Sequence, residues 1–142
     1  MVIRKRFGQH FLHDPAVIRR ILDAVAPTGS ERVVELGPGR GALTFGLLER
    51  AEQLDAVEID RDLAQLLEAD PRASGRLHLH VENMLETDFA RLRGQGPKLR
   101  IVGNLPYNVS TPVLFHLLNQ RGAIEDMHFM LQKEVVDRKS VV

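Results

Sequence analysis

The sequence of 142 residues contains no cysteine and no tryptophan, and it has a single tyrosine. Without cysteine, neither a disulfide framework nor a thiolate metal site can form, so we expect a reducing, cytoplasmic compartment. Long apolar runs are also missing, which predicts no membrane span. The basic N-terminal segment lacks the apolar core of a signal peptide. The mixed composition, with seven Pro and 11 Gly, excludes a low-complexity chain. These absences leave a soluble protein with one hydrophobic core.

An excess of one charge is missing too, because 19 Lys and Arg residues balance 19 Asp and Glu residues. The balance conceals two segments of opposite sign. Residues 1–20 hold five basic side chains and one acidic, whereas residues 55–70 hold six acidic and one basic. A neutral total argues against a nucleic-acid partner. The local excess of positive charge near the N-terminus keeps such a partner open.

Short apolar segments typical of strands alternate along the chain with segments typical of amphipathic helices. The predicted strands are 33–36, 54–59, 77–81, 99–103 and 127–131. The predicted helices begin at Pro15, near Ala42, after a cap at Asp62, and at Thr111-Pro112. This alternation predicts an α/β fold with a doubly wound, mainly parallel sheet. Such sheets bind ligands at the carboxyl ends of their strands, so the loops that follow the first four strands are the candidate site.

The loop after the first predicted strand is rich in glycine, with Gly37, Gly39 and Gly41 in a run of five residues. Glycines let the backbone turn tightly and approach a ligand without an intervening Cβ. The helix that follows presents unpaired amides at the same place. The spacing also satisfies the dinucleotide fingerprint, which leaves a nicotinamide cofactor as an alternative. Glu35, just before the glycines, favours instead a ligand with a cationic amino-acid end.

A carboxylate, Glu58, lies at the end of the second predicted strand, about twenty residues beyond the first glycine. In nucleotide-binding sheets a carboxylate at this place accepts hydrogen bonds from ribose hydroxyls. On its own, Glu58 would be interpreted as a solvated residue at the end of a strand. Together with the glycine loop, however, Glu58 predicts a cofactor that contains a nucleoside.

The segment Asn104-Leu105-Pro106-Tyr107 follows the fourth predicted strand and favours one kind of chemistry. The lone pair of an exocyclic amine on an aromatic base is delocalised into the ring. The Asn104 oxygen and a backbone carbonyl beside Pro106 can accept the two amine hydrogens and orient the nitrogen, while Tyr107 offers a stacking surface. Positioning then supplies most of the rate, because a sulfonium methyl is already activated. The segment predicts methyl transfer to the amine of a base.

Five segments, in this order, make the chain resemble the ribosomal RNA adenine dimethyltransferases. They are RKRFGQHFL (4–12), VELGPGRGALT (34–44), VEIDRDLA (57–64), GNLPYNVSTP (103–112) and MHFMLQKEVVDR (127–138). The resemblance implies a Rossmann-like fold of the S-adenosylmethionine-dependent type, with S-adenosylmethionine as cofactor. It also implies dimethylation of two adjacent adenosines near the 3′ end of small-subunit (16S) rRNA during ribosome biogenesis. The implied partner is 16S rRNA within the small ribosomal subunit.

The resemblance assigns roles to residues in the N-terminal segment and in the loops. The implied cofactor-binding residues are His10, Leu12, Gly37, Gly39, Glu58, Asn83 and Asn104. The implied catalytic residues are Asn104, Pro106 and Tyr107. His10 and Leu12 would close over the methionine part of the cofactor. The family usually has Asp in place of Asn83, where the carboxylate receives the adenine amino group, and an amide there keeps an acceptor oxygen without the charge.

The resemblance covers only the N-terminal part of the family, whose members continue past Arg138 into further strands and a helical domain. We therefore expect residues 1–142 to be an incomplete catalytic domain whose fifth strand forms a sheet edge suited to association with another chain. Two alternatives remain open. One is a non-catalytic fragment that binds cofactor or rRNA in small-subunit assembly, and the other is an adenine methyltransferase of large-subunit rRNA. We expect no metal, because His78 and His80 lack a third ligand.

Overall fold

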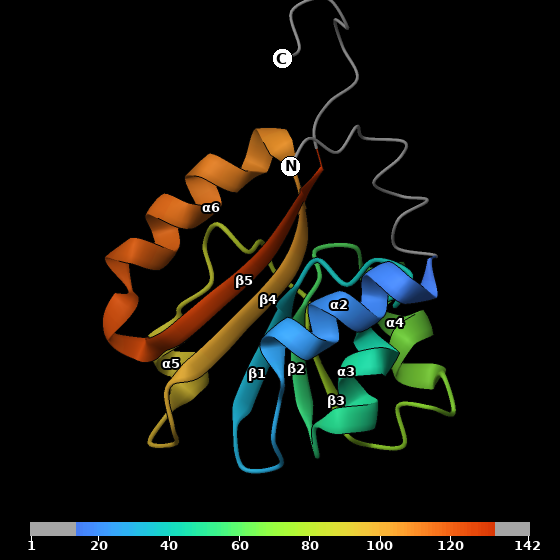
Figure 1. Cartoon of the computed structure of the whole chain (residues 1–142). Coiled ribbons are helices and arrows are strands. Elements are labelled where there is room, and N and C mark those ends of the chain that lie inside the picture. The colour runs from blue at the N-terminus through green and yellow to red at the C-terminus, as the bar shows by residue number, and fades with distance from the viewer. Residues whose placement is uncertain (1–13, 133–142) are drawn as a thin grey trace, which may run out of the picture.

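Five parallel strands form one sheet with the order β3-β2-β1-β4-β5 (Figure 1). The computed structural model describes residues 14–132 of the chain. The strands are β1 (Arg32–Leu36), β2 (Leu54–Val57), β3 (Leu77–His80), β4 (Leu99–Pro106) and β5 (Ile124–Gln132). All four pairings are parallel. The order reverses beside β1, as in doubly wound sheets, so the predicted fold class is confirmed.

Helices cover both faces of this sheet (Figure 1). They are α2 (Pro15–Val25), α3 (Thr44–Arg50), α4 (Arg61–Ala69), α5 (Phe89–Arg93), α6 (Tyr107–Asn119) and the 3₁₀ turn η1 (Arg121–Ala123). Helices α2, α3 and α4 pack on one face, and α5 and α6 pack on the other. Each connection between consecutive strands thus contains a helix that packs on one face of the sheet. Parallel strands require such long crossover connections.

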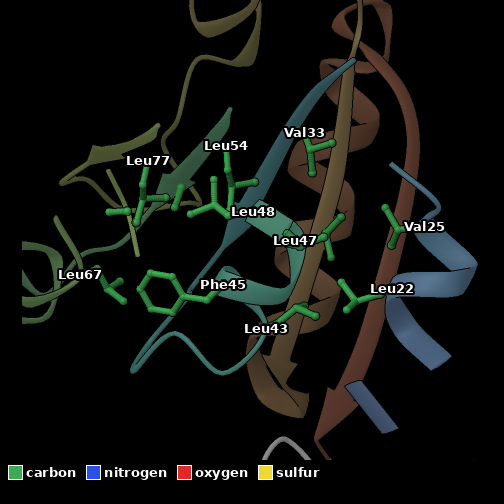
Figure 2. Packing of buried hydrophobic residues seen from close by; sticks show 13 residues of the cluster. Leu22, Val25, Val33, Leu43, Phe45, Leu47, Leu48, Leu54, Leu67 and Leu77 are labelled. Carbon is green, nitrogen blue, oxygen red and sulfur yellow. The ribbon is translucent and has the colours of Figure 1, made fainter. Parts of the chain in front are cut away.

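Two hydrophobic clusters lie on either side of the sheet because successive strand residues point to opposite faces. Val33 belongs to the cluster under α2, α3 and α4, where Leu47 and Leu54 are fully buried (Figure 2). The next residue, Val34, belongs to the opposite cluster, together with Phe89 of α5. Strands buried on both faces explain why the sequence shows continuous apolar runs here rather than a polar–apolar alternation.

Two predicted helix starts are wrong. Asp60, not Asp62, caps α4, and its carboxylate accepts hydrogen bonds from the amides of Asp62 and Leu63. Helix α6 begins at Tyr107, so Pro112 lies inside it rather than at its start. An internal proline removes one backbone hydrogen bond, and this loss is outweighed here by the burial of Val113 and Leu117.

Strands β4 and β5 are longer than predicted, whereas β2 ends at Val57 and β3 at His80, short of the predicted ends at residues 59 and 81. Asn104, Leu105 and Pro106 are not a loop but the last residues of β4, which pairs with β5 along its whole length. The added residues of β4 pair with Met130, Leu131 and Gln132 at the end of β5. Strand β5 also begins earlier than predicted, at Ile124 rather than Met127. The short helix α5 has no counterpart among the predicted elements, since its five residues are too few to show a helical period.

Candidate functional site

The glycine loop joins β1 to α3 at the carboxyl edge of the sheet. The Gly37 amide donates to the Val57 carbonyl at 2.9 Å, which ties the loop to β2. Gly39 and Gly41 have φ values of +59° and +90°, a region that favours glycine. A Cβ on Gly41 would lie 2.7 Å from the Phe45 ring, whereas a Cβ on Gly39 would meet nothing within 4 Å. Gly41 therefore allows close packing against Phe45, whereas Gly39 faces open space.

Glu58 connects the glycine loop to the beginning of α4. Its side chain is buried, and its two oxygens accept hydrogen bonds from the amides of Gly39 at 3.1 Å and Asp60 at 2.9 Å. These bonds fix the carboxylate but use only part of its capacity, since a carboxylate accepts about four. The remaining lone pairs suit a pair of ribose hydroxyls.

Glu35 is a second carboxylate beneath the loop and is only 2% exposed. Burial raises the pKa of Glu35 to about 7; a hydrogen bond from Thr44 opposes this effect, and the negative charge of Glu58 adds to it. The Thr44 hydroxyl donates to Oε1 at 2.6 Å. No cation contacts this carboxylate among residues 14–132. A ligand that brings an ammonium group would supply the missing positive charge.

The loop after β3 adds polar and apolar groups to the same edge. The Asn83 oxygen accepts a hydrogen bond from the Leu85 amide at 2.9 Å. The Met84 methyl lies 3.3 Å from the position of a Cβ on Gly37. Ile59 and Val81, at the ends of neighbouring strands, are 66% and 40% exposed. The apolar surface beside Glu58 suits a flat heterocycle. The sequence analysis did not assign this role to Ile59 or Met84. Their position as apolar residues among the polar residues that follow the strands could have indicated it.

Asn104 carries an unusual feature. Its side-chain oxygen is buried and has no hydrogen-bond partner in the described part of the chain. Buried acceptors without a partner are rare in folded proteins, and such a group is explained when a ligand supplies the donor. Pro106 ends β4 with a φ of −57°, and Tyr107 at the start of α6 is 53% exposed. The Asn104 oxygen, an acceptor without a partner, is thus followed closely in the sequence by the exposed ring of Tyr107.

The strand register brings the predicted residues of the loops to one edge. Leu36 pairs with Val57 on one side and with Gly103 on the other, so the segments that follow them are neighbours. The predicted residues at this edge are Gly37, Gly39, Glu58, Asn83, Asn104, Pro106 and Tyr107. Their roles stay predictions, and His10 and Leu12 lie outside the described residues.

The histidines of β3 and the lengths of the helices bear on a metal site and on a membrane span. His78 contacts Gln53 at 3.1 Å, and His80 contacts Asp55 at 2.8 Å. Within residues 14–132, no three His, Asp or Glu side chains are arranged to hold a metal ion. No helix in that range combines the length and apolarity needed to cross a bilayer.

A Rossmann-like sheet of this order, with a glycine loop, a buried carboxylate at the end of β2 and an amide at the end of β4, defines the class of S-adenosylmethionine-dependent methyltransferases. Within that class the particular family follows from the sequence. The chain matches the family described as "Ribosomal RNA adenine dimethylase" over residues 1–140. It belongs to that family.

Curated relatives agree with this assignment, and solved structures share the fold. "Ribosomal RNA small subunit methyltransferase A" of Pseudomonas aeruginosa is 56% identical over 135 residues, which are 95% of this chain and 50% of that protein. The crystal structure of the 23S rRNA methyltransferase ErmE matches with a TM-score of 0.68 and 27% identity over 80% of this chain and 45% of that one. A dimethyladenosine transferase from Plasmodium falciparum shares the fold, with a TM-score of 0.65 at 22% identity over 93% of this chain and 43% of that one. The chain spans about half the length of the curated relatives it matches.

Proposed function

We propose that this chain binds S-adenosylmethionine and forms the catalytic part of an adenine dimethyltransferase of small-subunit rRNA. The substrate would be the exocyclic amines of two adjacent adenosines near the 3′ end of 16S rRNA, within the small subunit in the cytoplasm. The family assignment and the names of the relatives support an rRNA substrate. The geometry of the carboxyl edge supports the chemistry.

The residues of the edge divide the work of binding. Glu58, held by the Gly39 amide, would accept the ribose hydroxyls, and the open space at Gly39 would leave room above the loop. The buried carboxyl of Glu35 would balance the positive charge of the amino-acid end. When bound, S-adenosylmethionine supplies an activated methyl group on a sulfonium. The protein needs to exclude water and hold the amine in line, because positioning accounts for a large part of such a rate. Tyr107 offers its exposed ring to an adenine extruded from the RNA stack.

The single observation that carries the proposal is the unpaired, buried oxygen of Asn104. An acceptor in that state is suited to one hydrogen of a target amine, and the carbonyl beside Pro106 is suited to the other. Accepting both hydrogens turns the nitrogen lone pair out of the ring and toward the methyl donor. On transfer the N–C bond would form as the carbon–sulfur bond of the donor breaks, which leaves the neutral thioether S-adenosylhomocysteine. The amine proton would then pass to solvent.

The test is transfer of labelled methyl groups to small ribosomal subunits that lack the modification. The protein should produce dimethyladenosine, and Asn104→Ala should reduce the product by about 10²–10³-fold while binding of S-adenosylhomocysteine persists. If cofactor binds but no label reaches RNA, the proposal fails, and the non-catalytic binding role is the better account.

A second candidate, methylation of large-subunit rRNA, is favoured by the similarity to ErmE, a 23S rRNA methyltransferase. Its identity of 27% is about half that of the small-subunit relatives. Offering the protein both ribosomal subunits and mapping the labelled nucleotide separates the two substrates.

A further inference from the structure

A groove of about 730 Å³ lies along α3, on the face of the sheet that α2, α3 and α4 cover (Figure 1). Its apolar lining comes from Ile18 and Leu22 of α2 and from Phe45 and Leu48 of α3. Its charged lining is almost entirely cationic. Five arginines line the groove, Arg19, Arg40, Arg50, Arg72 and Arg76, and a single carboxylate, Glu49, lies among them. We call this feature the arginine groove.

The positive charge of the arginine groove runs against the charge of the surrounding chain. Residues 14–132 contain 13 basic and 17 acidic side chains, and five of the 13 basic ones line this one groove. Asp23 pairs with Arg50 at 2.9 Å, and Asp70 pairs with Arg72 at 2.8 Å. With Glu49 included, three carboxylates face five arginines, so the groove keeps an excess of two positive charges. Such an excess attracts an anionic ligand.

Arg72 and Arg76 are held in place by the protein itself and form part of the groove wall. The Arg72 guanidinium lies 3.9 Å from the centre of the Phe45 ring and donates two hydrogen bonds to the Asp70 carboxylate. Arg76 donates to two backbone carbonyls at the end of α3, at 2.9 Å and 3.1 Å. Carbonyl groups carry no net charge, so Arg76 still contributes a positive charge to the groove.

Arg19 and Arg40 differ from the other arginines of the groove. Both are exposed, and their side chains make no hydrogen bond or ion pair with any of residues 14–132. Arg19 comes from α2, and Arg40 comes from the glycine loop. The planar guanidinium group presents five N–H donors in a fork that matches two oxygens of a phosphate. These two side chains are therefore suited to a ligand that carries several phosphates.

The arginine groove is continuous with the candidate site at the carboxyl edge. Gly41 and Ala42 line the groove together with Arg40, and Arg40 directly follows Gly39, which faces the open space of the site. A polyanion with one unit at the carboxyl edge can thus extend along the groove. This continuity favours RNA over an acidic peptide, because the substrate proposed for that edge is a nucleotide of RNA.

We propose that the arginine groove binds the phosphate backbone of RNA beside the target nucleotide, and that Arg19 and Arg40 contact the phosphates. The inference rests on the proposed function, because it takes the polyanion to be the RNA substrate. Phosphate contacts position a nucleic acid without reading its sequence. They also release the counterions of the RNA, so affinity falls as the salt concentration rises.

The test measures binding of the 142-residue chain to a fluorescein-labelled hairpin RNA from the 3′ end of 16S rRNA, by fluorescence anisotropy at a series of salt concentrations. Arg19→Gln should weaken binding about fivefold at about 0.1 M salt and reduce the slope of log affinity against log salt by about one. Arg40→Gln should act in the same way, and the double variant should reduce the slope by about two.

Arg20→Gln is the matched control. Arg20 is the neighbour of Arg19 on α2 and is also exposed, but it does not line the groove. It should therefore leave both the affinity and the salt slope unchanged. Arg19→Lys keeps the charge and should keep the salt slope. If Arg19→Lys lost as much slope as Arg19→Gln, or if Arg19→Gln and Arg20→Gln behaved alike, the inference would be overturned.

The outcomes separate this inference from the proposed function. If the chain binds the RNA and S-adenosylhomocysteine but Arg19→Gln has no effect, the inference alone fails. If the chain binds S-adenosylhomocysteine but no RNA down to about 0.05 M salt, the proposed RNA substrate fails and the inference fails with it. Labelled poly-glutamate tests the remaining occupant. Tighter binding of poly-glutamate than of RNA, weakened by Arg19→Gln, would assign the groove to an acidic protein and overturn the proposal.

Discussion

Charged side chains are paired differently at the amino edge of the sheet, where its strands begin, and at the carboxyl edge, where its strands end. At the amino edge, Arg100 on β4 contacts Glu31 at 2.8 Å and Asp126 on β5 at 2.9 Å. At the carboxyl edge, Glu35 lies close enough to Glu58 for the negative charge of Glu58 to raise the pKa of Glu35 further. The charged side chains of the amino edge are therefore paired with one another, whereas the carboxylates of the carboxyl edge have no cationic partner among the described residues.

The directions of the pKa shifts express this difference. A backbone hydrogen bond from Thr28, together with Arg100, holds the pKa of Glu31 below its usual value. Although burial opposes it, Arg100 also lowers the pKa of Asp126. Burial raises the pKa of Glu35 to about 7 at the other edge. A buried carboxyl group with a raised pKa and no cationic partner is typical of functional sites. Carboxylates that are paired with a cation are typical of structural ion-pair networks.

The largest expected effect is on the reaction itself. Asn104→Ala should reduce methyl transfer to RNA by about 10²–10³-fold, the usual loss when one positioned hydrogen-bonding group is removed from a reacting centre. The free energy of unfolding should change by less than about 1 kcal/mol, because the Asn104 oxygen makes no hydrogen bond in the described chain. Single-turnover transfer and urea unfolding measure the two quantities. A stability loss as large as the activity loss would place Asn104 among the structural residues.

Two glycines of one loop provide the next contrast. Gly41→Ala should lower the free energy of unfolding by about 3 kcal/mol, because the backbone there is left-handed and the new Cβ overlaps Phe45 and Leu67. Gly39→Ala should cost only about 1 kcal/mol, since its Cβ enters open space. That Cβ occupies the space assigned to the ligand, so Gly39→Ala should bind S-adenosylhomocysteine more weakly. Unimpaired binding by Gly39→Ala contradicts the assignment.

The third prediction concerns pH. The native pKa of Glu35, about 7, exceeds the ordinary value of 4.5, so the folded protein binds more protons between these values and loses stability as pH rises through them. Glu35→Gln should remove this dependence, raise the free energy of unfolding by about 3 kcal/mol at pH 8 and change nothing below pH 4. Thermal unfolding across the pH range measures it.

Glu31→Gln is the control of opposite sign. The pKa of Glu31 is lowered in the folded protein, so its contribution is present above the ordinary pKa and is lost as pH falls. Glu31→Gln should therefore be less stable than the parent at neutral pH and equal to it in acid. If both substitutions changed stability in the same direction at pH 8, the contrast between the two edges would fail.

The smallest effect is expected at the amino edge. Arg100→Met should lower stability by about 1 kcal/mol, because Glu31 and Asp126 keep 35% and 38% of their side-chain surface exposed and water replaces the lost partner. Arg50→Met, which breaks the exposed pair with Asp23, should have almost no effect. Neither substitution should alter ligand affinity. A change in affinity for Arg100→Met would mean that the two edges are coupled.

Much of the fold could be predicted from the sequence, because buried parallel strands leave apolar runs that turn residues and caps delimit. Val33–Leu36 and the glycines after it marked the first strand and its loop. The length of β4 could not be predicted, since Asn104 and Pro106 favour a loop locally and only pairing with β5 extends the strand through them. The start of α6 was predicted wrongly at Thr111-Pro112 for the same reason, because the packing of α6 outweighs the local preference of Pro112 for a helix start.

The candidate site was predictable in its residue types but not in its contacts. Glu58 and Asn104 could be chosen from their positions after strands. The bond between Glu58 and the Gly39 amide, and the unpaired Asn104 oxygen, depend on long-range packing that no local pattern encodes. Ile59 was missed because an apolar residue at a strand end is ordinary in sequence and is informative only once its exposure is known.

The most direct test of the contrast is a backbone amide NMR titration of the protein with S-adenosylhomocysteine. We predict that the amides of 37–41, 58–60 and 83–85 shift as the ligand is added, and that those of Arg100 and Asp126 stay in place. Shifts confined to the amino edge, or spread evenly over the sheet, would contradict the claim that the carboxyl edge is the ligand site.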